Sequence, residues 1–226
     1  MGKIIVIEGT DGSGKETQSK LLLDYLKKQG QKVVEFSFPM YESPTGAIFK
    51  DCVLGKNDVS IFPEGYEKID PEVVCLYTAA DRKYNSKKIQ EYLDQDYYVI
   101  LNRYTSSNMA HQGSKYEDSD ERFYMYQWID KLEYWLLKLP KPDYTFLLNI
   151  PYEYRIEWKE KQIFFDFDSK KKEEEDKILA SYLELAGLYH WDVIDCVKGS
   201  HSKSIEEIHQ EIVRLLTEKY HLFDKK

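Results

Sequence analysis

Residues 3–17 read Lys3-Ile4-Ile5-Val6-Ile7-Glu8-Gly9-Thr10-Asp11-Gly12-Ser13-Gly14-Lys15-Glu16-Thr17, and they carry the strongest structural signal in the chain. A run of β-branched residues predicts a strand, and a glycine-rich loop follows it. The leucines at 21, 22, 23 and 26 then predict an amphipathic helix. This order nearly fits G-x-x-x-x-G-K-[ST], in which loop amides and the helix N-terminus surround phosphate oxygens. We therefore predict a site for a nucleotide phosphate chain, built from Gly9, Thr10, Asp11, Gly12, Ser13, Gly14, Lys15, Glu16 and Thr17.

One position in the loop departs from this pattern. Glu16 stands where the pattern has a Ser or Thr whose hydroxyl coordinates Mg²⁺, and Thr17 comes directly after it. A carboxylate beside phosphates repels them unless Mg²⁺ lies between. Glu16 therefore either meets the metal or points away along the helix, and the sequence leaves both alternatives open.

Strand-like runs alternate with longer helical patterns along the rest of the chain. The predicted strands are residues 3–8, 32–38, 97–101, 144–150 and 191–196. The predicted helices are residues 17–28, 45–54, 71–93, 120–139, 173–189 and 204–220. Such alternation predicts a three-layer α/β/α fold with a parallel five-stranded sheet. No repeat or linker-like segment interrupts it, so residues 1–226 are expected to form a single domain.

Composition narrows the classes of partner. The chain has 32 Lys and Arg against 40 Asp and Glu, a net charge of -8, which argues against broad binding to nucleic acid or to an anionic membrane. No run approaches the roughly 20 apolar residues of a membrane helix. The odd number of cysteines, three, is typical of buried thiols in a reducing compartment, so we expect a cytoplasmic protein. An anionic ligand must then be held locally, which makes the positions of the arginines informative.

Further motifs follow the loop in a definite order. They are Phe38-Pro39-Met40-Tyr41, Asp81-Arg82, Asn102-Arg103-Tyr104 and Ser107-Asn108-Met109-Ala110-His111-Gln112-Gly113. Together with the loop, this order resembles the thymidylate kinases, a family of P-loop nucleoside-monophosphate kinases. The resemblance covers nearly the whole chain and continues through Leu139-Pro140-Lys141-Pro142-Asp143 and Tyr182-Leu183-Glu184-Leu185-Ala186.

The resemblance implies an enzyme that uses ATP and Mg²⁺ to phosphorylate a deoxynucleoside monophosphate, with dTMP to dTDP as the expected reaction. Lys15, Arg103 and Asp11 would be catalytic, and Arg103 and Arg82 would hold the acceptor phosphate. The implied acceptor site comprises Phe38, Pro39, Tyr41, Thr78, Arg82, Arg103, Asn108, His111 and Gln112, and the implied metal site comprises Glu16, Thr17 and Asn102. A homodimer and a lid at about 152–172 are further expectations.

Four departures from the family pattern keep alternatives open. Thr78 stands where the family has a phenylalanine that stacks on thymine, and His111 replaces an aromatic residue near the sugar. Both favour the alternative of a different nucleotide acceptor. Asn102 replaces an aspartate near the metal and the expected lid has one arginine, Arg155, which favours a nucleotide-binding homologue with little catalysis. If His111 lies beside the acceptor, its protonation near pH 6.5 should strengthen phosphate binding.

Overall fold

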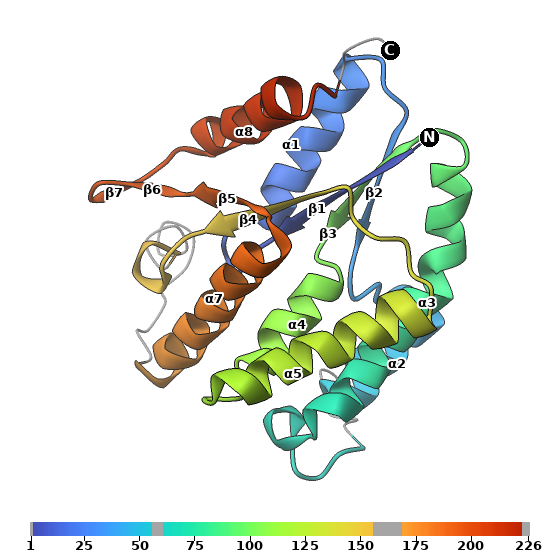
Figure 1. Cartoon of the computed structure of the whole chain (residues 1–226), viewed down its shortest axis with the longest axis vertical. Coiled ribbons are helices and arrows are strands. Elements are labelled where there is room, and N and C mark those ends of the chain that lie inside the picture. The colour runs from blue at the N-terminus through green and yellow to red at the C-terminus, as the bar shows by residue number, and fades with distance from the viewer. Residues whose placement is uncertain (1, 56–60, 156–168, 223–226) are drawn as a thin grey trace.

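A parallel sheet forms the centre of the structure, a computed structural model that describes residues 2–55, 61–155 and 169–222 (Figure 1). The strand order is β2-β3-β1-β4-β5, and all neighbouring strands run parallel. The strands are β1 Lys3–Glu8, β2 Val33–Ser37, β3 Tyr98–Asn102, β4 Tyr144–Asn149 and β5 Asp192–Asp195. The predicted five-stranded parallel sheet is therefore confirmed, with each predicted strand in place to within two residues at either end.

Helices fill the intervals between strands. They are α1 Lys15–Lys28, α2 Pro44–Ile48, α3 Pro71–Leu93, α4 Thr105–Gly113, α5 Ser119–Asp130, α7 Ser169–Tyr189 and α8 Ile205–Arg214. Three of them pass into wider π-helical turns, at Phe49–Val53, Lys131–Leu136 and Leu215–Lys219. A single 3₁₀ turn at Tyr66–Lys68 precedes α3, and a small hairpin of β6 Val197–Lys198 and β7 His201–Ser202 precedes α8. Most of the expected lid, residues 156–168, lies outside the described residues.

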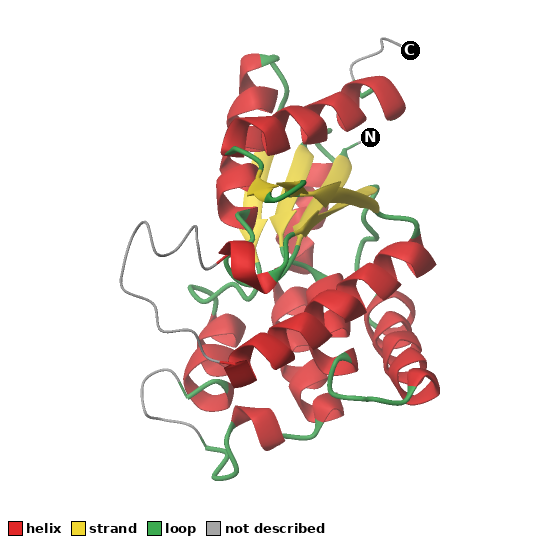
Figure 2. Ribbon diagram, turned by 90° about the vertical axis from the view of Figure 1, so that its left-hand side faces the viewer, coloured by secondary structure: helices red, strands yellow, loops and turns green. Residues whose placement is uncertain are grey.

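The sheet lies between two helical layers, as Figure 2 shows. Ile5 and Ile7 of β1 pack with Leu22 of α1 and Ile212 of α8 on one face. The alternate residues, such as Ile4, contact α3 on the opposite face. Each isoleucine of β1 is almost completely buried, which contributes about 1.5–3 kcal/mol apiece by the hydrophobic effect. The predicted three-layer fold is confirmed.

One helix beside the sheet is absent from the sequence prediction. The segment Thr105–Gly113 shows no apolar stripe, yet it forms α4. Every residue of α4 except His111 is buried, so polar and apolar side chains alike face protein and no amphipathic pattern develops. The carboxylate of Glu8 accepts hydrogen bonds from the backbone N–H of Tyr104 and Ser107, and it thereby caps the helix from β1.

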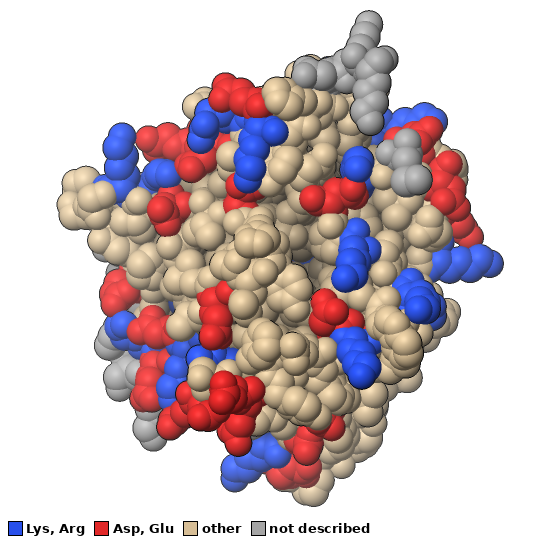
Figure 3. Space-filling model, viewed as in Figure 1, with Lys and Arg blue, Asp and Glu red and all other residues tan. Residues whose placement is uncertain are grey.

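The face in Figure 3 mixes charges of both signs, and of the three cysteines Cys75 and Cys196 are buried while Cys52 is half-buried. Among the described residues, no helix is long and apolar enough to cross a bilayer. The three cysteines form no disulfide, and burial raises the pKa of the Cys75 and Cys196 thiols to about 12.

Candidate active site

The glycine loop closes tightly around the first residue of α1. Gly9, Gly12 and Gly14 all have positive φ angles, and Gly14 is the N-cap of α1. A Cβ at Gly9 would lie 2.6 Å from Ser13 Oγ, so only glycine fits there. Lys15 is buried, and its Nζ donates to the Thr10 carbonyl oxygen over 2.7 Å. The loop thus surrounds the ammonium group of Lys15, which is hydrogen-bonded to the loop backbone.

The surroundings of Lys15 disfavour its positive charge. Burial and the neighbouring Arg103 guanidinium lower the pKa of Lys15 well below its ordinary value, while Asp11 and Glu8 oppose them. Within the described part of the chain, the buried hydroxyls of Thr10 and Ser13 have no hydrogen-bond partner. An anion at the loop would relieve both conditions, since it would stabilise the ammonium and accept the unpaired donors.

Two hollows meet beside the carboxyl ends of the strands. The larger cleft, of about 1220 Å³, runs from the loop residues Asp11 to Gln18 to the segment from β7 to the start of α8. The smaller pocket, of about 370 Å³, lies between α3 and α4. Both hollows are lined by Asp11, Phe38, Pro39, Tyr41 and Arg103. Parallel sheets collect ligands at this edge, and two ligands could meet at the shared residues.

The structure brings the predicted site residues together in these hollows. The smaller pocket is lined by all the predicted acceptor residues, which are Phe38, Pro39, Tyr41, Thr78, Arg82, Arg103, Asn108, His111 and Gln112. The larger cleft is lined by Asp11, Gly12, Ser13, Gly14, Lys15, Glu16 and Thr17, together with Asn102. Gly9 and Thr10 belong to the loop but line neither hollow. Gly9 allows the close approach of Ser13, and the Thr10 carbonyl oxygen accepts the hydrogen bond from Lys15.

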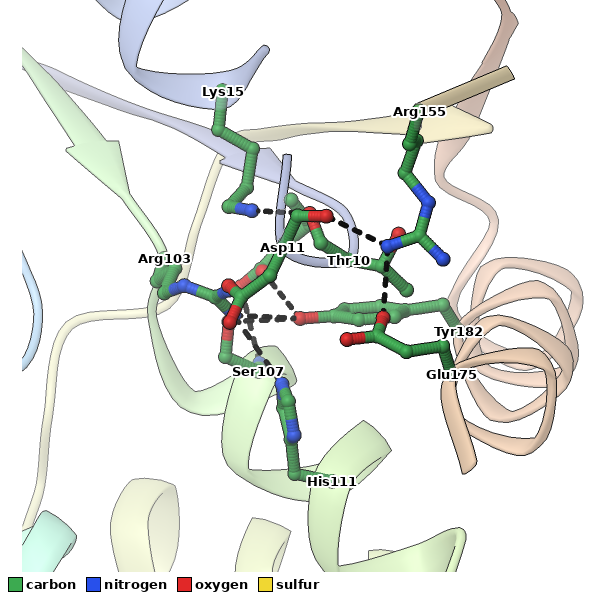
Figure 4. A network of polar contacts seen from close by, with 10 residues as sticks. Thr10, Asp11, Lys15, Arg103, Ser107, His111, Arg155, Glu175 and Tyr182 are labelled. Atoms are coloured by element: carbon green, nitrogen blue, oxygen red, sulfur yellow. Dashed lines mark hydrogen bonds and ion pairs between the residues drawn. The ribbon is translucent and has the colours of Figure 1, made fainter. Parts of the chain in front are cut away.

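Arg103 stands at the junction of the two hollows (Figure 4). It follows β3 with a φ of 66°, a left-handed conformation that costs an arginine energy and is common at functional sites. Its Nη2 pairs with the Asp11 carboxylate. Burial opposes the charge of Arg103, but Tyr182, Asp11 and Glu8 outweigh it and raise the pKa of Arg103. The protein atoms around the loop disfavour the charge of Asp11, but the guanidinium of Arg103 and the ammonium of Lys15 outweigh them and hold the pKa of Asp11 well below its usual range.

His111 differs from the expectation of a histidine that titrates near pH 6.5. Its Nε2 lies 3.4 Å from Arg103 Nη1. Burial, and then the positive charge of Arg103, lower the pKa of His111 to about 3. The imidazole is therefore neutral at physiological pH in this structure, and its ring nitrogen can accept a hydrogen bond from Arg103.

Arg82 lies in the smaller pocket with its charge already compensated. Its Nε and Nη2 donate to the two carboxylate oxygens of Glu133 over 2.6 and 2.5 Å. Nη2 also donates to Thr78 Oγ1 over 3.1 Å, and Thr105 Oγ1 donates to Glu133 Oε2 over 2.7 Å. Both charged side chains are almost completely buried. The pair is thus a neutral unit that joins α3 to the turn after α5.

Asp81, next to Arg82, organises the segment after β2, which lines both hollows. Its carboxylate accepts from Met40 N, Ser43 Oγ and Thr45 Oγ1 over 2.8, 2.8 and 2.9 Å. These bonds fix the chain after β2 against α3. Asp81 therefore holds Phe38, Pro39 and Tyr41 in place without itself lining either hollow.

The three predicted metal ligands, Glu16, Thr17 and Asn102, all line the larger cleft. Glu16 is 72% exposed, and its Oε1 lies 2.5 Å from Lys20 Nζ. Glu16 and Asn102 border a further hollow of about 400 Å³. Asn102 Oδ1 is buried and has no hydrogen-bond partner within the described part of the chain. Of the two alternatives for Glu16, this structure contains the one in which the carboxylate points away along the helix.

Arg155, from the start of the expected lid, reaches back to the loop. Its Nη1 donates to the Asp11 carbonyl oxygen over 2.7 Å and to Glu175 Oε2 over 2.8 Å. Glu175 belongs to α7, so this side chain joins the loop to α7.

Sequence reasoning missed several residues that support the site. They are Glu8, Gln18, Glu133, Ser107, Tyr182 and the residues from His201 to Ile205 that line the larger cleft. Glu8 did leave a signal, because it is an acid at the end of an otherwise apolar strand. Ser107 and Tyr182 begin two of the quoted motifs, but the sequence assigned them no role. Gln18, Glu133 and the cleft residues left no signal, since their partners are distant in the sequence.

Comparisons with known proteins agree with this geometry. A family model described as thymidylate kinase matches residues 7–212. A probable thymidylate kinase from Methanocaldococcus jannaschii is 36% identical over 214 residues, which cover 94% of this chain and 94% of the relative. The thymidylate kinase of Plasmodium falciparum is 30% identical over 220 residues, 96% of this chain and 90% of the relative. The structure of a thymidylate kinase from Candida albicans, reported to reveal the origin of its broad substrate specificity, matches with a TM-score of 0.70 and 25% identity, over 97% of this chain and 92% of its own.

Proposed function

This chain belongs to the thymidylate kinase family, and from that premise we propose that it transfers the γ-phosphoryl group of ATP to dTMP, giving ADP and dTDP. The observation that carries the proposal is the junction of the two hollows. A phosphate-binding loop lines one hollow, the predicted acceptor residues line the other, and Asp11 and Arg103 line both. The relatives, all named thymidylate kinases, do not favour the two alternatives that the sequence left open.

We assign the donor nucleotide to the larger cleft. Lys15 would leave the Thr10 carbonyl and bind the β and γ phosphates of ATP, while the loop amides and the Ser13 hydroxyl donate hydrogen bonds to the rest of the phosphate chain. The nucleoside would extend toward β7 and α8, where Ser202 Oγ is buried without a partner in the described part of the chain. Gln18 ties this wall to α1, because its Nε2 donates to the Ile205 carbonyl oxygen over 2.9 Å.

We assign the acceptor to the smaller pocket, with its phosphate at Arg103. Arg103 lines both hollows, and its partner Asp11 is mostly exposed and can yield to a phosphate dianion. The sequence predicts a phosphate contact for Arg82 too. Because Glu133 already neutralises Arg82, we propose instead that its remaining donor meets a neutral oxygen of the acceptor base. Asn108 Nδ2 and Gln112 Oε1 have no hydrogen-bond partner among the described residues and offer the base one donor and one acceptor.

We propose that Asn102 and Thr17 hold Mg²⁺ beside the loop. The unpartnered amide oxygen of Asn102 is a ligand that this hard cation accepts, and the hydroxyl of Thr17 lines the same cleft. When bound, the ion neutralises charge on the transferred phosphate. Glu16 pairs with Lys20 at the edge of this site and would meet the ion only by leaving that pair.

The acceleration would come from alignment and charge, not from covalent chemistry. Lys15, in the larger cleft, and Arg103, at the junction of the two hollows, would both contact the transferred group and stabilise its negative charge. The neutral His111 supports Arg103 as a hydrogen-bond acceptor and adds no competing positive charge. Asp11 completes the catalytic set by keeping Arg103 extended toward the loop until substrates arrive.

We also propose that residues 1–226 form one kinase domain with a lid at about 152–172, and that two chains form a homodimer. Exposed apolar side chains lie along α3, at Leu76 and Tyr84, and along the segment from α5 to its π-helical turn, at Tyr124 and Trp135. A second copy of the chain would cover them. Sedimentation of the wild type and of Trp135→Glu tests the dimer. The buried thiols favour a reducing, cytoplasmic location.

The reaction can be tested directly with purified protein. ATP and Mg²⁺ are incubated with each natural nucleoside monophosphate in turn, and the products are identified by mass. We expect dTDP to form fastest. Faster turnover of another monophosphate would support the alternative of a different acceptor. Binding of ATP without turnover of any acceptor would support a nucleotide-binding homologue with little catalysis.

A further inference from the structure

A buried carboxylate lies directly behind the arginine at the junction. Glu8, the last residue of β1, is fully buried, and its two oxygens accept five hydrogen bonds. Three go to Oε1, from Tyr104 N, Ser106 Oγ and Ser107 N, over 2.9, 2.6 and 3.1 Å. The other two go to Oε2, from Ser107 Oγ over 2.6 Å and Tyr182 OH over 3.1 Å. Both oxygens are therefore satisfied by groups of fixed position.

The two groups on Oε2 also contact Arg103. Arg103 Nη1 donates to Ser107 Oγ over 3.2 Å and to Tyr182 OH over 3.4 Å (Figure 4). Ser107 Oγ gives its proton to Glu8, and Tyr182 OH shares its proton between Glu8 and Ser107 Oγ, which lies 2.9 Å away. Each hydroxyl oxygen therefore presents a lone pair to the guanidinium. The hydroxyls come from different elements, Ser107 from α4 and Tyr182 from α7. Arg103 therefore donates to two hydroxyl oxygens that Glu8 orients by accepting hydrogen bonds from them.

This arrangement leaves the charge of Arg103 available to a ligand. Asp11 pairs with Nη2 on the side of the hollows, where a phosphate would have to displace it. Glu8 acts from the opposite side, through neutral hydroxyls, and stays in place when a ligand binds. Its negative charge favours the charged forms of both Arg103 and Lys15. A positioned cation with one face open is what binding and transfer of a phosphoryl group require.

We infer that Glu8, Ser107 and Tyr182 form a positioning triad that fixes the Arg103 guanidinium at the acceptor phosphate. Through Tyr182, α7 then contributes to acceptor binding although Tyr182 does not line the smaller pocket. The role at the acceptor phosphate rests on the proposed function, whereas the hold on Arg103 does not. The three residues act through Arg103 and are positioning residues.

Kinetics with matched variants test the role at the acceptor. Ser107→Ala and Tyr182→Phe each remove a hydroxyl shared by Glu8 and Arg103. Ser106→Ala removes a hydroxyl that contacts Glu8 alone, and Tyr126→Phe removes a buried hydroxyl that donates to Glu184 over 2.9 Å. We expect the KM for dTMP to rise about tenfold in the first two variants, the effect of losing one hydrogen bond to a charged group, with the KM for ATP nearly unchanged. The two control variants should keep both KM values.

Arginine side-chain NMR tests the hold on Arg103 without substrate. The sequence has five arginines, so selective ¹⁵N labelling gives a short set of signals that single Arg→Lys variants can assign. In the wild type, the Nη groups of Arg103 should rotate slowly. Rotation should become faster in Ser107→Ala and Tyr182→Phe but stay unchanged in Ser106→Ala. Arg122, paired with Glu184, provides an internal reference.

The outcomes separate the two proposals. If the wild type phosphorylates no dTMP but the Arg103 signals respond as expected, the proposed function fails and the triad stands as the seat of Arg103. If the wild type is active and the two shared hydroxyls can be removed without a change in the KM for dTMP or in the Arg103 signals, the triad is wrong. Glu8→Gln is unsuitable alone, because Glu8 also caps α4 and the variant could fail to fold.

Discussion

Replacing Glu133 by Gln should destabilise the protein strongly. Glu133 is fully buried and makes two hydrogen bonds to Arg82, whose side chain is only 5% exposed. Glutamine keeps the shape but removes the charge, so the Arg82 guanidinium remains buried without a counter-ion. Breaking a buried ion pair in this way costs about 3–5 kcal/mol. For a chain of 226 residues, at about 2–4 °C per kcal/mol, the midpoint should fall by about 6–20 °C.

A second pair in the same chain supplies the control. Arg122 and Glu184 also form an ion pair, with the Nε to Oε2 distance at 2.7 Å, but their side chains are 22% and 35% exposed. Solvent screens that pair, so Glu184→Gln should cost only about 0–1 kcal/mol. Both variants are measured by urea unfolding and by calorimetry, at the same pH and without nucleotide.

A third variant separates charge burial from packing. Arg82→Met combined with Glu133→Leu removes both charges and should be more stable than Glu133→Gln alone. The double variant should also lose affinity for dTMP, because Arg82 lines the smaller pocket. If Glu133→Gln and Glu184→Gln cost the same, the argument from burial is refuted.

Three further predictions concern the loop and the hollows. Lys15→Ala should lower kcat by orders of magnitude with little change in the unfolding midpoint, and wild-type turnover by this variant would refute the kinase mechanism. Because the folded pKa of His111, about 3, lies below its ordinary value of 6.5, its contribution to stability is complete above pH 6.5 and is lost as the pH falls toward 3. In His111→Phe, the free energy of unfolding should depend less steeply on pH between 3 and 6.5. If the two proteins show the same pH dependence in this range, the lowered pKa of His111 is contradicted. In a double-mutant cycle of Glu16→Thr and Asn102→Asp, read as Mg²⁺-dependent kcat/KM, the effects should be additive within about 0.5 kcal/mol, because Glu16 pairs with Lys20; a larger coupling would mean that both residues meet the metal.

The sequence predicted the central strands well because β1 and β3 are continuous apolar runs. Both β1 and α3 begin and end in the structure at the residues that the sequence predicted. The signals there are strong. Buried parallel strands read as runs of Val, Ile and Leu, and Pro71 with Asp70 as N-cap marks the start of α3.

The helix α4 could not be predicted from an amphipathic pattern because it is buried on nearly all sides. Amphipathic patterns arise when one face of a helix meets water, and α4 has almost no such face. Its N-terminus is capped by Glu8, a residue almost a hundred positions earlier, and not by a local Ser or Asp. A family resemblance still found Asn108, His111 and Gln112, because motif order does not depend on knowing the secondary structure.

Arg82 and Arg103 show what motif order leaves undetermined. Both arginines sit in family motifs, and from the sequence both appear equally suited to a phosphate. The structure separates them by their counter-ions, which come from 51 and 92 residues away. Glu133 is fully buried and cannot leave Arg82, whereas Asp11 is 71% exposed and can be displaced from Arg103. An incoming dianion gains most from the cation whose partner is displaceable, so we expect the phosphate at Arg103, with Arg82 left to recognise the uncharged part of the same ligand.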